Sequence, residues 1–210
     1  MRPLRLIRLV ASLALFVAAA NWGLVRAQET DERPEARSDT SALARALASR
    51  DPLERQRAAE DLARLAAVDQ KKLIEGYRLQ EKNRKVRLAL DWALYRTGKS
   101  EALFQIVAEL NSSRHDQAVE YLSQLESPDP LYLFLKQETN QAKVTVGLLE
   151  GLGRIGNAQS LDVVKPFRDS FSPGVAEAAE LATEQIERRL TQSEPSKPAR
   201  PRTVEKPERL

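Results

Sequence analysis

The chain has 210 residues, of which 42% are hydrophobic, with no cysteine and a single histidine. Without cysteine it can form neither a disulfide nor a zinc site built on thiolates. The formal net charge of +3 comes from the first residues, because residues 1–27 hold four arginines and no acidic residue, and the rest of the chain has 29 basic against 30 acidic residues. A nucleic-acid-binding domain needs clustered positive charge on its folded part, so we expect no nucleic-acid partner.

Residues 1–27 have the pattern of a secretory signal peptide. Three arginines precede an apolar run over residues 9–20. Val25 and Ala27 provide the small residues at positions −3 and −1, and we expect cleavage after Ala27. The apolar run is shorter than the ~20 residues of a membrane span. The sequence therefore predicts a periplasmic or secreted protein. The alternative is a retained N-terminal anchor, and we expect membrane contact only in that case.

The two ends of the remaining chain differ from its middle in composition. Residues 28–39 contain no large aliphatic or aromatic side chain, so residues 28–40 are predicted to be a flexible acidic spacer. Residues 191–210 contain four prolines and five basic residues, which is typical of a disordered Pro-rich basic tail. Residues 41–190 are left as the folded domain.

Between these ends, apolar residues recur every three or four positions, as in amphipathic helices. The pattern predicts a helix over 41–49, four helix pairs and a terminal helix over 175–190 with an acidic face of Glu177, Glu180, Glu184 and Glu187. The predicted pairs are 53–65 with 73–79, 84–96 with 101–110, 115–125 with 131–136, and 141–155 with 158–171, the last helix bending at Pro166. Residues 143–146 favour a strand locally, but their place in the pattern predicts a helix.

A faint internal repeat connects the first helices of these pairs. Similar segments recur around Leu62, Leu94, Leu122 and Leu152, with spacings of 32, 28 and 30 positions, and each is followed by a shorter apolar helix. Such a period is typical of solenoids, in which neighbouring helix pairs must stack to bury their apolar faces. We expect an all-α fold, a right-handed α-solenoid of stacked antiparallel helix pairs with about four and a half repeats.

Three segments resemble the HEAT-repeat family in its bacterial HEAT-like form. They are Asp-Pro-Leu-Glu-Arg at 51–55, Asn-Arg-Lys-Val-Arg at 83–87 with Gly98, and the Gly-rich end of the helix at 144–157. The family's arginine is matched by Arg55 and Arg87, whereas the copies at 115, 141 and 173 lack it, so the repeats are degenerate. Tetratricopeptide repeats are the alternative, but the spacings here are shorter. The resemblance implies a binding scaffold, without naming its ligand.

A basic cluster provides the best candidate binding surface. It comprises Lys71, Lys72, Arg78, Lys82, Arg84, Lys85 and Arg87, and we single out Lys82, Arg84, Lys85 and Arg87 as candidate residues for an anionic protein partner. A solubilising surface is the alternative. We expect four aromatic residues to pack between repeats: Tyr77, Trp92, Tyr95 and Phe104. Any of them that is exposed on the concave face becomes the first candidate hot spot.

Residues suited to catalysis do not converge in the sequence. Residues 151–156 match G-x-G-x-x-G, but a dinucleotide site needs those glycines between a strand and a helix, and here they end a helix. His115 is expected to be exposed at a helix start, and its neighbour Asp116 is badly placed to form a triad with it. We therefore expect no enzymatic activity, no cofactor and no metal site.

Together these patterns predict a non-enzymatic exported scaffold that binds a protein partner through its solenoid surface. Two alternatives remain open at this point. One is a membrane-tethered assembly factor. The other is a hydrolase, or an accessory or cofactor-handling protein related to HEAT-like lyase subunits, which a polar concave pocket with converging arginines and carboxylates would favour.

Overall fold

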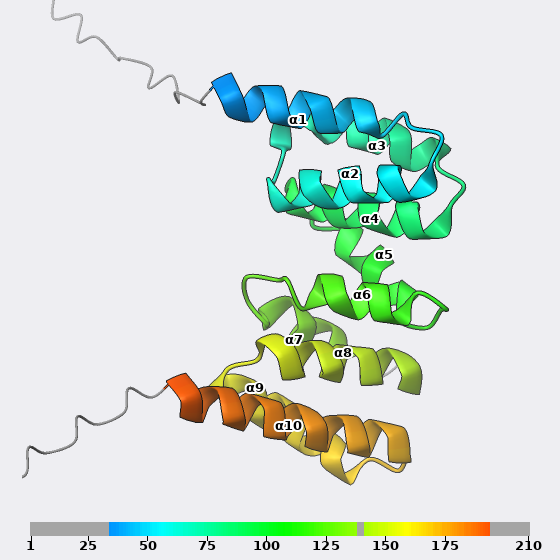
Figure 1. Ribbon diagram of the computed structural model, residues 1–210. Coiled ribbons are helices and arrows are strands. Elements are labelled where there is room, and N and C mark those ends of the chain that lie inside the picture. Colours follow the sequence, from blue (N-terminus) through cyan, green and yellow to red (C-terminus); the bar gives the residue numbers. More distant parts are fainter. Residues whose placement is uncertain (1–33, 138–140, 194–210) are drawn as a thin grey trace, which may run out of the picture. The chain divides into compact units, whose positions relative to one another are not determined.

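The computed structural model describes residues 34–137 and 141–193, and in this part of the chain the protein is all-α, with ten α-helices and no strand. Their bounds are α1 Pro34–Ala46, α2 Pro52–Arg64, α3 Lys71–Gln80, α4 Arg84–Arg96, α5 Ala102–Glu109, α6 His115–Leu122, α7 Asp129–Leu135, α8 Ala142–Ile155, α9 Ala158–Val164 and α10 Pro173–Ser193. Figure 1 shows these helices following one another in chain order. The predicted signal peptide and residues 194–210 of the predicted tail lie outside the described residues.

The first helix begins earlier than the sequence pattern predicts. It starts at Pro34 instead of residue 41, so residues 34–40 of the predicted spacer are helical. Proline is favoured in the first turn of a helix, where its missing N–H needs no partner. The same helix buries Ala44 and packs along α2, and Leu47 directly after it is also buried. Such tertiary packing stabilises a helix beyond its local propensity.

Equivalent residues start α2 and α4. Asp51 precedes α2, and its side chain accepts a hydrogen bond from the Leu53 N–H at 3.0 Å. Asn83, which lies 32 positions later, accepts from the N–H groups of Lys85 and Val86 at 2.9 and 3.3 Å. Side-chain acceptors of this kind satisfy amide groups that have no partner within the helix. The sequence repeat therefore corresponds to a repeated helix cap.

The same two helices also end alike. After α4, the Lys99 N–H bonds the Leu94 carbonyl at 2.9 Å, and Gly98 takes a left-handed conformation with φ of 90°. After α2, the Ala67 N–H bonds the Leu62 carbonyl at 3.1 Å, and Ala66 takes the left-handed conformation with φ of 47°. Both are Schellman-type ends, which most often carry glycine at the left-handed position.

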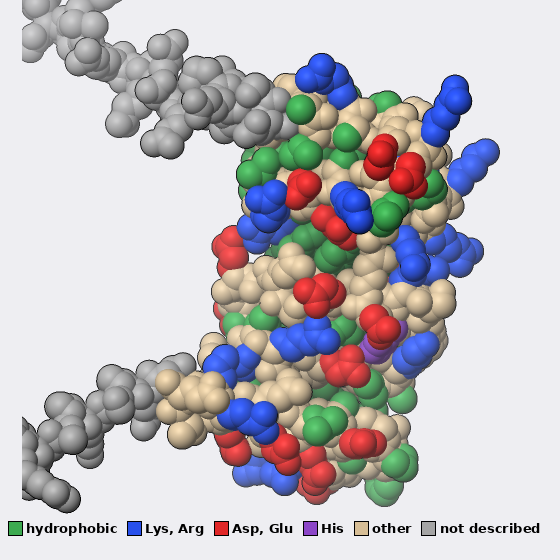
Figure 2. Space-filling view, viewed as in Figure 1, with side chains coloured by type: hydrophobic (Ala, Val, Ile, Leu, Met, Phe, Trp, Pro, Cys, Tyr) green, Lys and Arg blue, Asp and Glu red, His purple; other side chains and the backbone are tan. Residues whose placement is uncertain are grey.

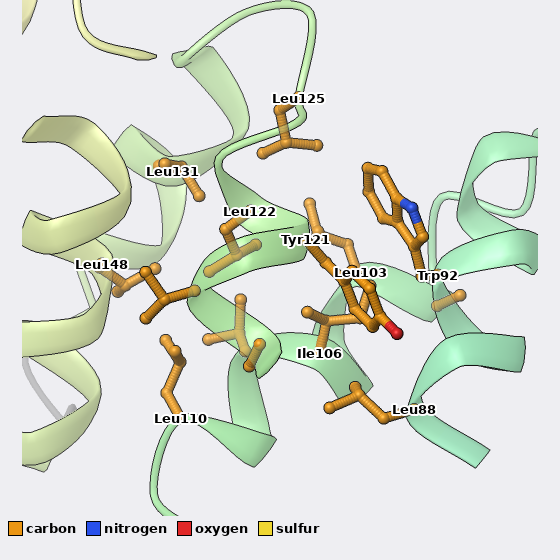
Figure 3. Close-up of a cluster of buried hydrophobic side chains, with 14 of the residues drawn as sticks. Leu88, Trp92, Leu103, Ile106, Leu110, Tyr121, Leu122, Leu125, Leu131 and Leu148 are labelled. Atoms are coloured by element: carbon orange, nitrogen blue, oxygen red, sulfur yellow. The ribbon is translucent and has the colours of Figure 1, made fainter. Parts of the chain in front are cut away.

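Apolar side chains from successive helices form one continuous core. The repeat residues Leu62, Leu94, Leu122 and Leu152 are all buried. Figure 3 shows the central part of this core, where side chains from α4 to α8 converge, among them Leu88, Trp92, Leu103, Ile106, Leu110, Tyr121, Leu122, Leu125, Leu131 and Leu148. Each helix from α2 onward thus buries its apolar face against neighbours close to it in the chain.

The C-terminal helices pack closely because glycines remove side chains between them. Gly153 of α8 lies so close to α10 that an added Cβ would lie 3.3 Å from the Cα of Ala182.

The bend predicted at Pro166 takes the form of a change from α-helix to a 3-10 turn over Lys165–Asp169. The acidic face predicted on α10 is exposed at all four glutamates. No helix among the described residues is both long and apolar enough to cross a membrane.

Candidate functional site

The four candidate basic residues lie where α3 turns into α4, and the structure separates them. Lys82, Arg84 and Lys85 are exposed, whereas Arg87 is half-buried and donates from Nε and Nη2 to the Glu81 carbonyl at 3.2 and 2.7 Å. In Figure 2, Lys and Arg side chains gather at this edge, while acidic side chains gather over α10.

None of these four side chains forms an ion pair with a carboxylate in the part of the chain that the structure describes. The nearest acidic residue in sequence, Glu81, is occupied by Arg55, which donates from Nε and Nη2 to its carboxylate at 2.7 and 3.0 Å. Other basic side chains of the region are paired: Arg78 with Asp91, and Lys99 with Glu75. The start of α4 therefore carries positive charge that other described side chains do not neutralise.

Two of the four candidates line a cavity of about 330 Å³ on the surface of α4. Arg84 and Arg87 share this cavity with Arg78 of α3 and with Gln105 and Glu109 of α5, and Leu88 and Asp91 of α4 also line it. Lys85 does not line it, and Lys82 borders a different depression near the end of α1. The basic cluster in the sequence is thus divided between a recessed site and an exposed rim.

Asp91 is the buried acidic residue of this site. Its side chain lies between apolar neighbours on α4 and receives two hydrogen bonds from Arg78, Nε to Oδ1 at 2.8 Å and Nη2 to Oδ2 at 3.2 Å. Burial raises the pKa of the Asp91 carboxyl, and the Arg78 guanidinium opposes that rise. The two hydrogen bonds hold Arg78 in place across the α3–α4 contact.

A second cavity, of about 480 Å³, adjoins the first and shares Arg78, Asp91 and Gln105 with it. It is also lined by Glu75, Leu79, Leu94, Lys99, Glu101 and Ala102. We call the two cavities together the α3–α5 groove. The groove exists because α3 and α5 each pack against α4 without packing extensively against each other.

Aromatic side chains on another side of α4 have a structural role. Trp92 stacks between Tyr95 and Tyr121, with 5.6 Å between ring centroids on each side. The Tyr121 hydroxyl donates to Glu60 of α2 at 2.7 Å, so α6 is tied to α2 across α4. Burial, with the hydrogen bond to Glu60, raises the pKa of Tyr121. This stack agrees with the packing role that the sequence predicts for Trp92 and Tyr95.

Phe104 departs from that prediction. It is 57% exposed on α5, and its ring makes a T-shaped contact with Phe134 of α7, with 5.0 Å between centroids. A helix as short as α5 has room for one buried face, which Leu103, Ile106 and Val107 occupy. The prediction that Phe104 packs between repeats is therefore met only at its contact with Phe134.

His115 is also placed differently from the prediction. Only 17% of its side chain is exposed; Nδ1 lies 2.8 Å from the Leu110 carbonyl, and Nε2 lies 3.0 Å from a carboxylate oxygen of Glu150 on α8. The expectation of an exposed histidine was wrong because His115 packs against α8, where its partner Glu150 lies 35 positions away in the sequence. The residue connects the start of α6 to α8.

The glycine string at 151–156 lies in and after α8. Gly151 and Gly153 are inside the helix, and Gly156 follows its last residue, where an added Cβ would lie 2.9 Å from Ile186 of α10. The string is therefore in a helix–helix contact and does not connect a strand to a helix. Within the described ranges, no group of three or more acidic or histidine side chains is arranged to hold a metal ion.

Sequence reasoning missed part of the groove, although one signal was present. Asp91 is the single charged residue in the run from Leu88 to Leu94, where every other side chain is apolar and buried. A lone carboxylate in such a run requires a partner. The identities of Arg78 and Gln105 as its neighbours could not be read from the sequence, because they come from two other helices.

Comparison with known protein families finds no family model that matches the chain, and comparison with curated proteins finds no significant match. The resemblance to HEAT-like repeats therefore stays a prediction that rests on the residues quoted for it.

Proposed function

We propose that this protein is an exported, non-enzymatic scaffold with a HEAT-like solenoid fold, which binds an acidic protein partner through the basic residues at the start of α4. The observation that carries the proposal is that four neighbouring basic side chains form no ion pair with a carboxylate in the described part of the chain: Lys82, Arg84, Lys85 and Arg87. Unneutralised charges on a rigid surface attract a partner of opposite charge and orient it.

The solenoid arrangement is supported by the repetition of contacts. Asp51 and Asn83 cap equivalent helices, and Ala66 and Gly98 end them, each pair being 32 positions apart. Neighbouring first helices also pack in order, α2 with α4, α6 with α8 and α8 with α10. A stack of this kind offers a preformed surface, so a partner binds without first ordering the scaffold.

A protein-binding role agrees with the chemistry of the groove. Three of the four acidic groups that line it are paired with basic residues: Asp91 with Arg78, Glu75 with Lys99 and Glu109 with Arg114. Each of these carboxylates is held by a cation, which suits recognition more than proton transfer. We accordingly assign binding, and no reaction, to this surface.

The test is an in-cell crosslinking experiment with matched charge reversals. The first variant carries Lys82→Glu, Arg84→Glu and Lys85→Glu. The control carries Lys136→Glu, Lys165→Glu and Arg168→Glu, which are exposed basic residues directly after α7 and in the 3-10 turn after α9. We expect the same partner to be captured by the natural chain and by the control, and to be lost from the first variant. Equal capture by all three, or no capture by the natural chain, would contradict the proposal.

Export and cleavage are tested separately by sequencing the N-terminus of the chain purified from its own cells. The proposal predicts that it begins at Gln28. A chain that retains residues 1–27 would favour the membrane-tethered alternative.

A further inference from the structure

We propose that the α3–α5 groove binds a peptide segment of the partner in which acidic and apolar side chains alternate. The acidic side chain would occupy the arginine-lined cavity, and the apolar side chain would lie in the adjoining cavity beside Leu79. This inference rests on the proposed function and names the chemistry that the partner presents.

The arginine-lined cavity is arranged for a carboxylate. Arg78 is held by two hydrogen bonds to Asp91, and Arg87 by two to the Glu81 carbonyl, and in both cases the donors are Nε and Nη2. In the part of the chain that the structure describes, Nη1 of both residues makes no hydrogen bond, and the Arg84 guanidinium makes none at all. Guanidinium groups that are already fixed lose little freedom when they bind a carboxylate, which they prefer to contact with two N–H groups.

The charge of this cavity favours an anion. Three arginines line it with two carboxylates, and both carboxylates are engaged, Asp91 by Arg78 and Glu109 by Arg114. Arg84 and Arg87 form no ion pair with a described carboxylate, although the charge of Arg87 acts on Asp91. A bound anion would neutralise them in a recessed site, where charge-assisted hydrogen bonds are stronger than at an open surface.

The adjoining cavity supplies the apolar contact. Leu79 is 82% exposed at its edge, and Leu94 and Ala102 line it, while Glu75 and Lys99 neutralise each other at 2.7 Å. An apolar side chain placed here would cover Leu79 and would leave that ion pair intact. Because the two cavities share Arg78, Asp91 and Gln105, neighbouring groups of one ligand can occupy both.

The position of the arginines inside the groove favours a peptide over a membrane surface as the ligand. A flat anionic surface contacts protruding side chains, and Lys82 and Lys85 would be its main contacts. Arg78 and Arg87 lie lower, on the walls of the groove, and are only partly exposed. An extended peptide segment can place one side chain in each cavity and reach them.

The probe is a blocked hexapeptide of alternating glutamate and leucine, titrated into the purified full chain while the side-chain NMR signals of Arg78, Arg87 and Gln105 are followed. A peptide with glutamine in place of glutamate, inorganic phosphate and phosphatidylglycerol vesicles are the comparison ligands. We expect saturable binding of the glutamate peptide, weaker binding of the glutamine peptide, and an affinity that falls as the salt concentration rises.

Three charge reversals locate the site. Arg84 lines the groove, Lys85 is its exposed neighbour outside the groove, and Arg57 is an exposed control on α2. We expect Arg84→Glu to weaken peptide binding about tenfold or more, since it removes charge-assisted hydrogen bonds, and Lys85→Glu and Arg57→Glu to weaken it by about twofold at most. Leu79→Ser should also weaken it, because the apolar contact is lost.

Each other outcome overturns the inference. Equal weakening by Arg84→Glu and Lys85→Glu would indicate a diffuse basic surface, which removes the groove but leaves the proposed function standing. Vesicle binding without peptide binding would assign the site to lipid, and phosphate binding with no preference for the glutamate peptide would assign it to a free anion. The absence of peptide binding at peptide concentrations up to about 1 mM would also reject the groove, because a Kd of about 1 mM corresponds to a binding free energy of about −4 kcal/mol. Loss of partner capture in the crosslinking experiment tests the proposed function independently.

Discussion

Arg55 and Arg87 lie 32 positions apart and make the same hydrogen bond. Nη1 of Arg55 donates to the Ser49 carbonyl at 2.9 Å, and Nη2 of Arg87 donates to the Glu81 carbonyl at 2.7 Å, so each guanidinium contacts the backbone six residues before it. Each arginine thereby fixes the loop that precedes its helix. They differ in one respect: Arg55 also forms an ion pair with the Glu81 carboxylate, whereas Arg87 forms no ion pair with a described carboxylate and acts on Asp91 only through its charge.

This difference predicts unequal effects of removing the two arginines. Arg55→Met leaves the Glu81 carboxylate without its ion-pair partner, and that side chain is only 8% exposed, so we expect a loss of about 3 kcal/mol in the free energy of unfolding. Arg87→Met removes bonds to a carbonyl and should cost about 1 kcal/mol. Urea unfolding measures both.

Arg57→Met is the matched control for Arg55→Met, because Arg57 is exposed on the same helix. It should change the free energy of unfolding by less than about 0.5 kcal/mol. Equal losses at positions 55 and 57 would show that the ion pair with Glu81 contributes nothing to stability.

The same ion pair predicts a pH dependence of stability. The hydrogen bond from Arg55 holds the pKa of Glu81 below its ordinary value of 4.5. A carboxyl whose pKa is lower in the folded state stabilises the protein fully above its unfolded pKa, and this contribution is lost as the pH falls through the folded pKa. Between pH 7 and pH 3, the natural chain should therefore lose more stability than Glu81→Gln. Parallel pH profiles would contradict this assignment.

Ala66 occupies a position that favours glycine. Its φ of 47° places it in the left-handed region at the end of α2, where Gly98 stands at the end of α4. Ala66→Gly should raise the free energy of unfolding by about 0.5–1 kcal/mol, since glycine adopts this conformation without steric cost. Gly98→Ala should lower it by about 1 kcal/mol for the same reason. Thermal unfolding of the two variants should give midpoints displaced in opposite directions.

Two other glycines should respond oppositely to the same substitution. At Gly147 of α8, an added Cβ would lie 2.6 Å from Cδ2 of Leu110 and 2.9 Å from Cε1 of His115, so Gly147→Ala should cost about 1–3 kcal/mol by overpacking. A Cβ added at Gly76 of α3 would have no atom within 4 Å other than those of its chain neighbours and the backbone of the helix itself. Gly76→Ala should therefore stabilise the helix by about 0.5–1 kcal/mol. A stabilising Gly147→Ala would show that α6 and α8 are less tightly packed than the structure indicates.

Local signals explain why many helix boundaries could be predicted. The sequence pattern predicted a helix over 84–96, and α4 spans Arg84–Arg96, because the Asn83 cap and the Gly98 end lie beside it in the sequence. The start of α1 could not be predicted in the same way. Its first turns carry few apolar residues, and the buried apolar side chains Ala44 and Leu47 lie at its end and directly after it.

The site was only partly predictable, for reasons of geometry. Arg84 and Lys85 are neighbours in the sequence, but successive residues on a helix point in directions about 100° apart, so one lines the groove and the other does not. Arg78 and Gln105 join the site from α3 and α5, which depends on how both helices pack on α4. Likewise, the partner of His115 is on α8, and no local pattern indicates that contact.

The most direct test of the account places a photoreactive amino acid at single positions in living cells. Leu79 lies at the edge of the α3–α5 groove, and Phe171, which is even more exposed, lies in the loop before α10. The account predicts that one partner protein is crosslinked from position 79 and not from position 171, and that Arg84→Glu abolishes this crosslink. Equal crosslinking from both positions, or a crosslink at position 79 that survives Arg84→Glu, would contradict the claim that the basic groove on α4 binds the partner.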